Sequence, residues 1–97
     1  MIGPTPPVHP GEILSEEFLN PLGLAPYTVA RDCLVPRTRI ERLARCETPV
    51  TADTALRLGR YFDTGPEFWM NLQTMYDLAT GLTRAPRIAD IRPRKVA

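Results

Sequence analysis

The chain has 97 residues, of which 43% are hydrophobic and 24% are charged. This composition is typical of one small globular domain, so it excludes a two-domain enzyme, a membrane protein and a wholly disordered chain. Twelve basic residues against eleven acidic ones leave a net charge of +1, and taken over the whole chain this balance argues against a nucleic-acid partner.

Proline residues mark the start of several predicted helices, because the first helical turn tolerates a residue without a backbone N–H. The chain has eleven prolines, and most of them lie at the edges of apolar segments. The first helix is predicted over residues 10–19, with Ile13, Leu14 and Phe18 on its apolar face. We expect this helix to stop before Pro21.

Two short helices are predicted next, over residues 26–33 and 36–45, with a connection of two residues. This is the spacing of a helix-turn-helix, whose tight crossing needs a small residue inside the first helix, here Ala30. Apolar residues occupy the other positions that such a unit requires: Val29, Cys33, Val35, Ile40 and Leu43. Leu34 stands where many such turns have glycine, so we expect either another turn geometry or backbone strain there.

A fourth helix is predicted with Thr51 as its N-cap and with four apolar residues buried: Ala55, Leu56, Leu58 and Phe62. A fifth is predicted after Thr64, because Thr64 and Glu67 have the spacing of a capping box. Its wide apolar face includes Phe68, Trp69, Leu72, Met75 and Tyr76. The one stretch that favours a short strand is residues 88–91. Five helices with short joints predict an all-α bundle.

The chain is therefore predicted to form one compact domain with an irregular segment at each end. The domain covers residues 8–79, residues 1–7 form a flexible N-terminus, and residues 80–97 form a flexible basic tail. Both ends have too little apolar surface to offset the entropy that is lost when they become ordered. The tail is either a solvated end or an arm that adds phosphate contacts or folds on a partner protein.

The near-neutral net charge is the sum of four successive segments whose charges alternate in sign. Residues 31–60 hold seven arginines against four acidic residues. The tail from Arg84 is also basic, whereas residues 1–30 and 61–83 are acidic. The helix predicted over 36–45 leaves six polar residues for solvent: Arg37, Thr38, Arg39, Glu41, Arg42 and Arg45. Four of these six are arginines, so the local charge favours a nucleic-acid partner where the net charge argues against one.

Arginine can meet guanine O6 and N7, or a phosphate, with two hydrogen bonds at once, and the N-terminal half of the second helix is the part that enters the major groove. The candidates for base edges are Arg37, Thr38 and Arg39, and Arg42 is a candidate for either role. The candidates for phosphates are Arg45 and three residues of the preceding helix: Tyr27, Thr28 and Arg31. The alternative is an ordinary solvated helix that carries many arginines.

The aromatic face of the fifth helix has two interpretations. It either closes the core of one protomer or forms a dimer surface, because aromatic side chains combine a large apolar area with few rotamers. We expect a shared role, in which four residues contribute to a homodimer interface: Phe68, Trp69, Leu72 and Tyr76. A symmetric pair would hold two recognition helices about 34 Å apart, which is one turn of duplex DNA.

The sequence contains no set of residues typical of an active site, a metal site or a cofactor site. His9 is the only histidine and is interpreted as part of a helix start, and Cys33 and Cys46 are expected to be reduced. Because no nucleophile–base pair and no phosphate-binding glycine loop is present, neither an enzymatic activity nor a cofactor is predicted. No apolar run approaches the ~20 residues that span a bilayer, so we expect a cytoplasmic protein without a membrane partner.

Several separate blocks of the sequence follow one another in an order known from one protein family. The blocks are residues 9–14, 16–19, 21–24, 40, 51–62, 66–73 and 76–78. Together they closely resemble HigA antitoxins of type II toxin–antitoxin modules over about residues 8–79, which is a more specific match than a helix-turn-helix alone. The chain departs from that pattern at Leu34 and Cys46, which are commonly glycine in relatives, and at Cys33, where an aliphatic residue is usual.

The resemblance implies a lambda-repressor-like fold of the Xre/Cro type, also called VapI-like. It further implies a bacterial protein that dimerises, binds a palindromic operator, represses its own operon and neutralises a HigB-type toxin, which is an mRNA-cleaving ribonuclease. Two alternatives stay open. One is a stand-alone Xre-family transcriptional regulator without a toxin partner, and the other is a protein-interaction bundle that does not bind DNA and whose arginines meet an acidic partner.

Overall fold

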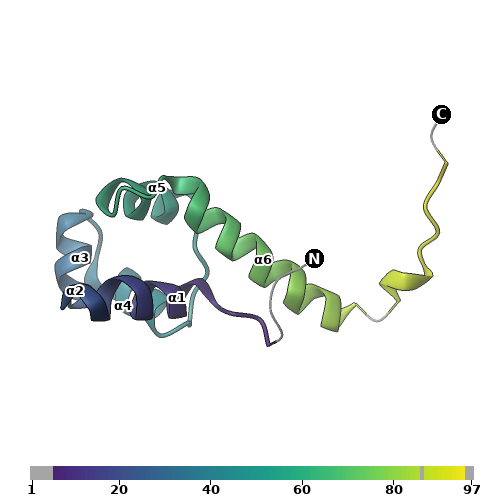
Figure 1. The fold of residues 1–97 in the computed structure, drawn as a ribbon, viewed down its shortest axis with the longest axis horizontal. Helices are drawn as coiled ribbons and strands as arrows, with labels where there is room; N and C mark the ends of the chain where they lie inside the picture. The colour runs from purple at the N-terminus through teal and green to yellow at the C-terminus, as the bar shows by residue number, and fades with distance from the viewer. Residues whose placement is uncertain (1–5, 86, 96–97) are drawn as a thin grey trace.

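The chain folds into helices joined by short connections, as a computed structural model shows for residues 6–85 and 87–95 (Figure 1). The elements are α1 (Pro10–Ile13), η1 (Leu14–Leu19), α2 (Asn20–Leu22), α3 (Pro26–Asp32), α4 (Arg37–Ala44), α5 (Ala52–Tyr61), α6 (Pro66–Arg84) and η2 (Ile88–Asp90). Element η1 is a π-helix and η2 is a 3-10 helix. Neither described stretch contains a strand, which confirms the all-α class. Most of the predicted flexible N-terminus and the end of the tail lie outside the described residues.

The first helical segment is longer than predicted, because α1, η1 and α2 follow one another without a break. The prediction that this helix stops before Pro21 is therefore wrong. In an α-helix the proline ring clashes with the carbonyl four residues earlier, but the wider π turns of η1 lie directly before Pro21 and relieve the clash. The N–H of Asn20 accordingly donates to the carbonyl of Ser15, five residues back. The segment ends at Gly23, whose φ of 63° is left-handed.

His9 lies directly before α1 and caps it. Its ring nitrogen Nδ1 accepts a hydrogen bond of 2.9 Å from the backbone N–H of Gly11, which confirms the predicted role at the helix start. The ring also meets Tyr76 of α6 edge to face, with the two centroids 4.8 Å apart. Because only a neutral imidazole has a lone pair at Nδ1 for this bond, protonation of His9 removes the cap.

We expect His9 to make the stability of the protein depend on pH below about pH 6.5. Burial lowers the pKa of His9, and the nearby Asp77 carboxylate offsets part of this effect. The unfolded chain therefore takes up a proton at a pH where the folded chain does not. The contribution of His9 is complete above the ordinary pKa and decreases as the pH falls toward the lowered folded pKa.

The matched variant for this prediction is His9→Asn, which keeps a capping side chain but does not titrate in this range. Urea unfolding of both proteins at about pH 7.5 and about pH 5 should show a smaller loss of stability in the variant. Equal losses in the two proteins would mean that His9 does not contribute to the pH dependence.

The turn between α3 and α4 keeps a tight helix-turn-helix geometry despite its leucine. Leu34 has a φ of 61°, in the left-handed region, and is 83% exposed. The N–H of Val35 donates to the carbonyl of Ala30 over 3.0 Å and closes the turn. The sequence left either another turn geometry or backbone strain at Leu34, and the structure shows backbone strain. Cys46, the other residue that replaces a common glycine, likewise has a φ of 62°.

We expect Leu34→Gly to raise the free energy of unfolding by about 0.5–1 kcal/mol, because glycine adopts a positive φ without steric cost. The gain is limited because glycine also increases the entropy of the unfolded chain. Leu34→Ala is the matched control, since it removes the same exposed side chain but keeps a Cβ, and its stability should stay close to that of the parent. If urea unfolding finds the glycine variant no more stable than the alanine variant, the turn is not strained.

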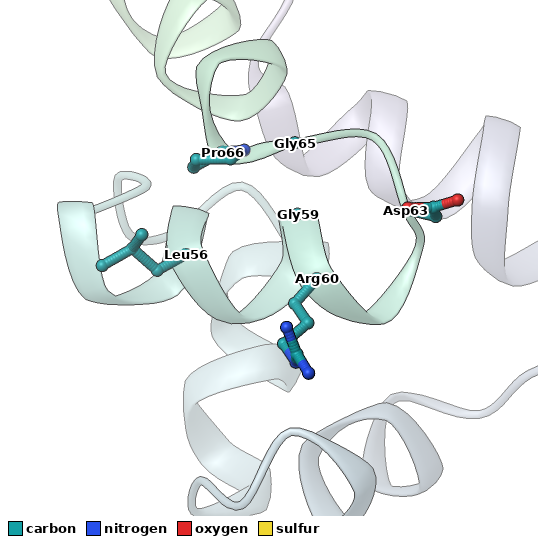
Figure 2. A pocket seen from close by; sticks show the side chains of 6 residues that line it. All are labelled: Leu56, Gly59, Arg60, Asp63, Gly65 and Pro66. Atoms are coloured by element: carbon teal, nitrogen blue, oxygen red, sulfur yellow. The ribbon is translucent and has the colours of Figure 1, made fainter.

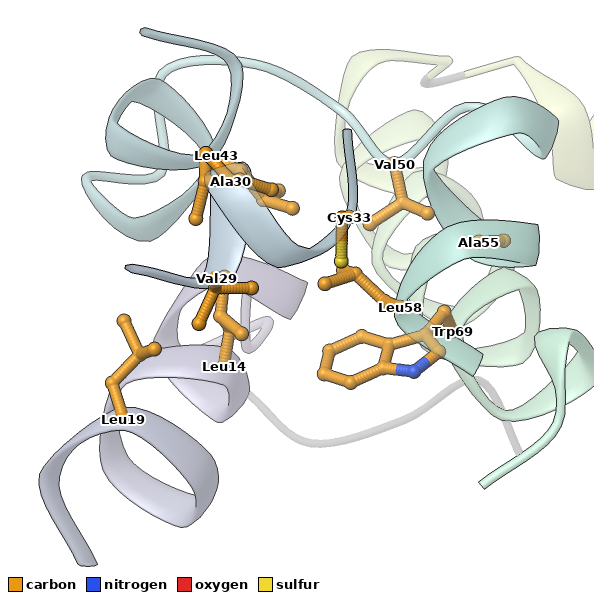
Figure 3. Packing of buried hydrophobic residues seen from close by; sticks show 11 residues of the cluster. Leu14, Leu19, Val29, Ala30, Cys33, Leu43, Val50, Ala55, Leu58 and Trp69 are labelled. Atoms are coloured by element: carbon orange, nitrogen blue, oxygen red, sulfur yellow. The ribbon is translucent and has the colours of Figure 1, made fainter. Parts of the chain in front are cut away.

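The core lies where the helices meet (Figure 3) and contains most of the residues that helical spacing assigns to it. Its most deeply buried members include Leu14, Val29, Ala30, Ile40, Leu43, Leu58 and Trp69. The prediction for Leu56 is wrong, since this side chain is 59% exposed. It borders a shallow hollow between α5 and the start of α6.

The predicted N-cap of α5 is confirmed, whereas the predicted capping box of α6 is not formed. Thr51 Oγ1 accepts a hydrogen bond of 3.3 Å from the N–H of Thr54. The N-cap of α6 is Gly65, which has no side chain for capping, and Thr64 Oγ1 instead accepts from Nε1 of Trp69 over 2.9 Å. The indole N–H of a buried tryptophan needs an acceptor, and this need takes the Thr64 hydroxyl away from the helix end.

Helix α6 has 19 residues and continues to Arg84, beyond the expected start of the tail at residue 80. It packs against α5 and α1, and its C-terminal end extends away from the other helices (Figure 1). The stretch predicted as a short strand is the 3-10 helix η2, in which the N–H of Ile91 donates to the carbonyl of Ile88 over 3.1 Å. None of the helices in the described ranges is long and apolar enough to cross a bilayer.

Candidate nucleic-acid interface

Helix α4 packs against the core through a narrow apolar side, so its arginines face the solvent. Ile40 and Leu43 are each 1% exposed and belong to the core. At the end of the helix, the hydroxyl of Ser15 donates to the carbonyl of Ala44 over 3.1 Å. The five residues predicted on this helix for DNA contact are all exposed: Arg37, Thr38, Arg39, Arg42 and Arg45. We call these five residues the arginine face.

Two arginines of the arginine face have acidic neighbours on their own segment. Arg37 pairs with Glu41 one turn later on α4, at 3.1 Å, and its side chain is 69% exposed. Arg45 pairs with Glu47, also at 3.1 Å, and its side chain is 62% exposed. Ion pairs near the surface contribute little to stability, so both exposed guanidinium groups can exchange their carboxylate for a phosphate at small cost.

Arg39 differs because it connects two helices. It pairs with Asp53 in the first turn of α5, and Asp53 also accepts a hydrogen bond of 2.9 Å from Nε of Arg57. Hydrogen bonds from Arg57 and then Arg39 hold the pKa of the Asp53 carboxyl below its usual range. Arg57 also donates from Nη1 to the carbonyl of Cys33 over 2.8 Å. Sequence reasoning missed Asp53 and Arg57, because their i,i+4 spacing gives no sign of a partner on another helix.

Arg42 is the arginine of this face that forms no ion pair within the described residues. Together with Thr38 and Arg39, it borders a shallow depression between α4 and the N-terminal end of α5. An unpaired guanidinium beside an open depression is available to a base edge or to a phosphate. This position agrees with either of the two roles predicted for Arg42.

The three residues predicted on α3 for phosphate contacts differ in accessibility. Tyr27 is 53% exposed, Arg31 is exposed and Thr28 is half-buried. Arg31 pairs with Asp32 at 3.2 Å, and the Asp32 carboxylate also accepts a hydrogen bond of 2.8 Å from the hydroxyl of Tyr61. The hydrogen bonds from Tyr61 and Arg31 lower the pKa of the Asp32 carboxyl. Because α3 packs against α4, both helices would approach a ligand as one unit.

The four residues predicted for a homodimer interface do not share one accessible surface. Trp69 is completely buried within its own protomer, so its assignment to the interface is corrected. Tyr76 is half-buried and lies against the ring of His9. Phe68 is 37% exposed, and Leu72 is half-buried. Helical periodicity identifies a broad apolar face but does not show how much of that face the same chain covers.

The shallow hollow beside Leu56 is not lined by a set of catalytic residues. Figure 2 shows it where the chain turns from α5 into α6, and its lining residues are Leu56, Gly59, Arg60, Asp63, Gly65 and Pro66. One guanidinium and one carboxylate form no nucleophile–base pair. Within the described ranges, no three side chains of His, Cys, Asp or Glu gather as a metal site would require. Burial raises the pKa of the thiols of Cys33 and Cys46.

Proteins with similar sequences and folds include antitoxins and DNA-binding regulators. The chain is 49% identical over 73 residues to virulence-associated protein I of Dichelobacter nodosus, which covers 75% of this chain and 68% of that protein. It is 36% identical over 72 residues to antitoxin HigA-1 of Vibrio cholerae, which covers 74% of this chain and 68% of that protein. The structure of Pseudomonas aeruginosa antitoxin HigA with the higBA promoter is 42% identical with a TM-score of 0.86, and covers 92% of this chain and 99% of that one. The chain belongs to the HigA family of antitoxins.

Membership of the HigA family confirms the resemblance and the helix-turn-helix fold expected from the sequence. A second solved structure, antitoxin GraA in complex with its operator, has a TM-score of 0.85 at 42% identity and covers 94% of this chain and 93% of that one. No family model matches the chain. The HigA family consists of DNA-binding regulators and antitoxins and is not a family of enzymes, as the sequence predicts.

Proposed function

We propose that this HigA-family protein is an antitoxin and an operator-binding repressor. As a dimer it binds a palindromic operator in its own promoter and represses its operon, and it neutralises a HigB-type mRNA-cleaving toxin in the bacterial cytoplasm. The observation that carries the proposal is the arginine face, which lies on the second helix of the helix-turn-helix. Relatives solved with a promoter or an operator support the same function.

In this proposal the N-terminal half of α4 enters the major groove. Arg37, Thr38 and Arg39 contact base edges, and Arg42 contacts either a base or a phosphate. The phosphate contacts that set the register come from Arg45, Tyr27, Thr28 and Arg31. The guanidinium groups of Arg37 and Arg45 are exposed, so phosphates can replace their carboxylate partners when DNA binds.

A gel-shift titration with the protein's own promoter, compared with a scrambled duplex of equal length, tests the DNA-binding part. We expect a dissociation constant on the order of 10 nM at physiological salt, and weaker binding as salt rises because phosphate contacts release counterions. Failure of the purified protein to shift its own promoter would instead favour the protein-interaction bundle.

Co-expression with the product of the adjacent gene tests the antitoxin part. We expect the two proteins to co-purify and the antitoxin to abolish mRNA cleavage by its partner. A protein that shifts its promoter but neither binds nor inhibits the neighbouring gene product would be a stand-alone regulator of the Xre type.

A further inference from the structure

The Asp53 carboxylate of α5 meets two arginines through the same oxygen atom. Its Oδ2 accepts a hydrogen bond of 2.9 Å from Nε of Arg57 and also pairs with Nη1 of Arg39. All three side chains are partly exposed, with between 38% and 52% of each accessible to solvent. Two positive charges therefore share one negative charge next to the arginine face, and the sharing affects how firmly Arg39 is held.

Arg57 is held by more contacts than Arg39. It lies one turn after Asp53 on the same helix, and its Nη1 also donates to the carbonyl of Cys33 over 2.8 Å. Its guanidinium is thus fixed between α5 and the turn that follows α3. Among the described residues, the guanidinium of Arg39 has Asp53 as its only hydrogen-bond partner, and Arg39 borders the open depression between α4 and α5. Of the two arginines, Arg39 is the one that can leave.

Contact with a base edge requires Arg39 to leave Asp53, and the charge that remains behind determines what this costs. An unpaired carboxylate beside DNA would repel the phosphates and attract Arg39 back. Arg57 stays on the same oxygen, so Asp53 is still paired after Arg39 has left. The two guanidinium groups also repel each other while both are on Asp53, which weakens the hold on Arg39.

We propose that Arg57 is a positioning residue for DNA recognition, which keeps Asp53 paired and thereby leaves Arg39 available to a base edge. The inference rests on the proposed function, because it concerns how Arg39 reaches the operator. Arg57 stays with Asp53 and the carbonyl of Cys33 when DNA binds, and it does not contact a phosphate. It therefore increases the preference for the operator and not the affinity for DNA of any sequence.

Fluorescence anisotropy with the protein's own promoter and with a scrambled duplex tests the proposal through the ratio of the two dissociation constants. Arg57→Ala should lower this ratio about fivefold, because Asp53 then pairs with Arg39 alone. Adding Asp53→Asn to the same chain removes that hold and should restore the ratio to within about twofold of the parent. The double variant has the net charge of the parent, so general attraction to DNA cannot explain the recovery.

Arg57→Lys is the matched variant that keeps the positive charge. A lysine has one ammonium group in place of a planar fork, so it can pair with Asp53 but not also hold the carbonyl of Cys33. It should keep the ratio within about twofold of the parent. A loss in Arg57→Lys as large as in Arg57→Ala would assign the effect to the turn and overturn the proposal.

Two further results of the same titrations would also overturn it. The first is a failure of Asp53→Asn to restore the ratio in the Arg57→Ala chain. The second is an equal weakening of promoter and scrambled DNA by Arg57→Ala, with a salt dependence lower by about one ion, because this result would make Arg57 a phosphate contact.

NMR titration of the Asp53 carboxyl carbon tests the pairing without DNA and without a change at Arg57. In Arg39→Ala the pKa of Asp53 should stay below its usual range, because the hydrogen bond from Arg57 is the largest cause of its lowering. A return of this pKa to its ordinary value in Arg39→Ala would mean that Arg57 does not hold Asp53. This result would overturn the proposal even if Arg57→Ala did not fold.

The two measurements distinguish failure of this inference from failure of the proposed function. If the parent does not distinguish its promoter from the scrambled duplex, the repressor function fails, while a lowered pKa of Asp53 in Arg39→Ala still confirms the pairing. If the parent distinguishes the two duplexes and Arg57→Ala does so equally well, the function stands and the role of Arg57 fails.

Discussion

Arg39→Ala should weaken binding to the operator about 5- to 150-fold, equivalent to about 1–3 kcal/mol, and should relax the preference at one base pair. Arg39 lies in the half of α4 that is expected to enter the major groove, and its guanidinium can contact O6 and N7 of a guanine at once. Fluorescence anisotropy with operators changed at one base pair at a time measures both effects. The base pair whose substitution no longer matters to the variant is the one that Arg39 contacts.

The ion pair with Asp53 requires a control, because Arg39→Ala also breaks the connection between α4 and α5. Asp53→Asn removes the carboxylate but keeps both arginines, and it takes a negative charge away from the proposed DNA side. It should bind all duplexes somewhat more tightly and keep its discrimination between operators. Equal loss of discrimination in Arg39→Ala and Asp53→Asn would assign a structural role to Arg39.

Arg45→Ala is the second control, since this residue is expected to contact phosphate. It should weaken binding to the operator and to scrambled DNA alike, and lower the salt dependence by about one ion. Loss of base preference in Arg45→Ala but not in Arg39→Ala would reverse the two assignments.

The helix-turn-helix follows from the sequence because its requirements are local. Ala30 and the apolar positions around it lie within fifteen residues, and the structure buries all of them except Val35, which is half-buried against the core. The left-handed backbone at Leu34 is one of the two outcomes that the sequence left open at this turn, and only the structure decides between them. The predicted helix end before Pro21 is wrong because no local sequence signal indicates a π-helix. The wider turns of a π-helix accept a proline that an α-helix excludes.

The parts of the site that the sequence does not reveal depend on contacts between helices. The pairing of Arg39 with Asp53 needs the relative position of α4 and α5, which no spacing within one helix supplies. The apolar face of α6 has the same limitation: periodicity groups Phe68 with Trp69, but only packing shows that the protomer itself covers Trp69 and leaves Phe68 partly exposed. Tertiary burial therefore decides which half of a predicted face remains for a partner.

Gly11→Ala should lower the free energy of unfolding by about 3 kcal/mol, which is a large effect for a single added methyl group. α1 crosses the end of α4 so closely that a Cβ at residue 11 would lie 1.8 Å from the carbonyl oxygen of Leu43 and 3.2 Å from the backbone nitrogen of Cys46. These atoms cannot rotate away, because the N–H of Cys46 donates to that same carbonyl over 2.9 Å. The substitution therefore forces α1 and α4 apart.

The displacement should also reach DNA binding, because the segment that follows α1 holds the end of α4 through the hydrogen bond from Ser15 to Ala44. Gly81→Ala is the matched control: no atom lies within 4 Å of its Cβ, and alanine in a helix interior should stabilise by roughly 0.5–1 kcal/mol. Urea unfolding followed by the fluorescence of Trp69 measures both variants. An unchanged midpoint for Gly11→Ala would mean that α1 does not approach α4 so closely. The expected loss of stability would show that Gly11, which the sequence places only at a helix start, is required to position the arginine face.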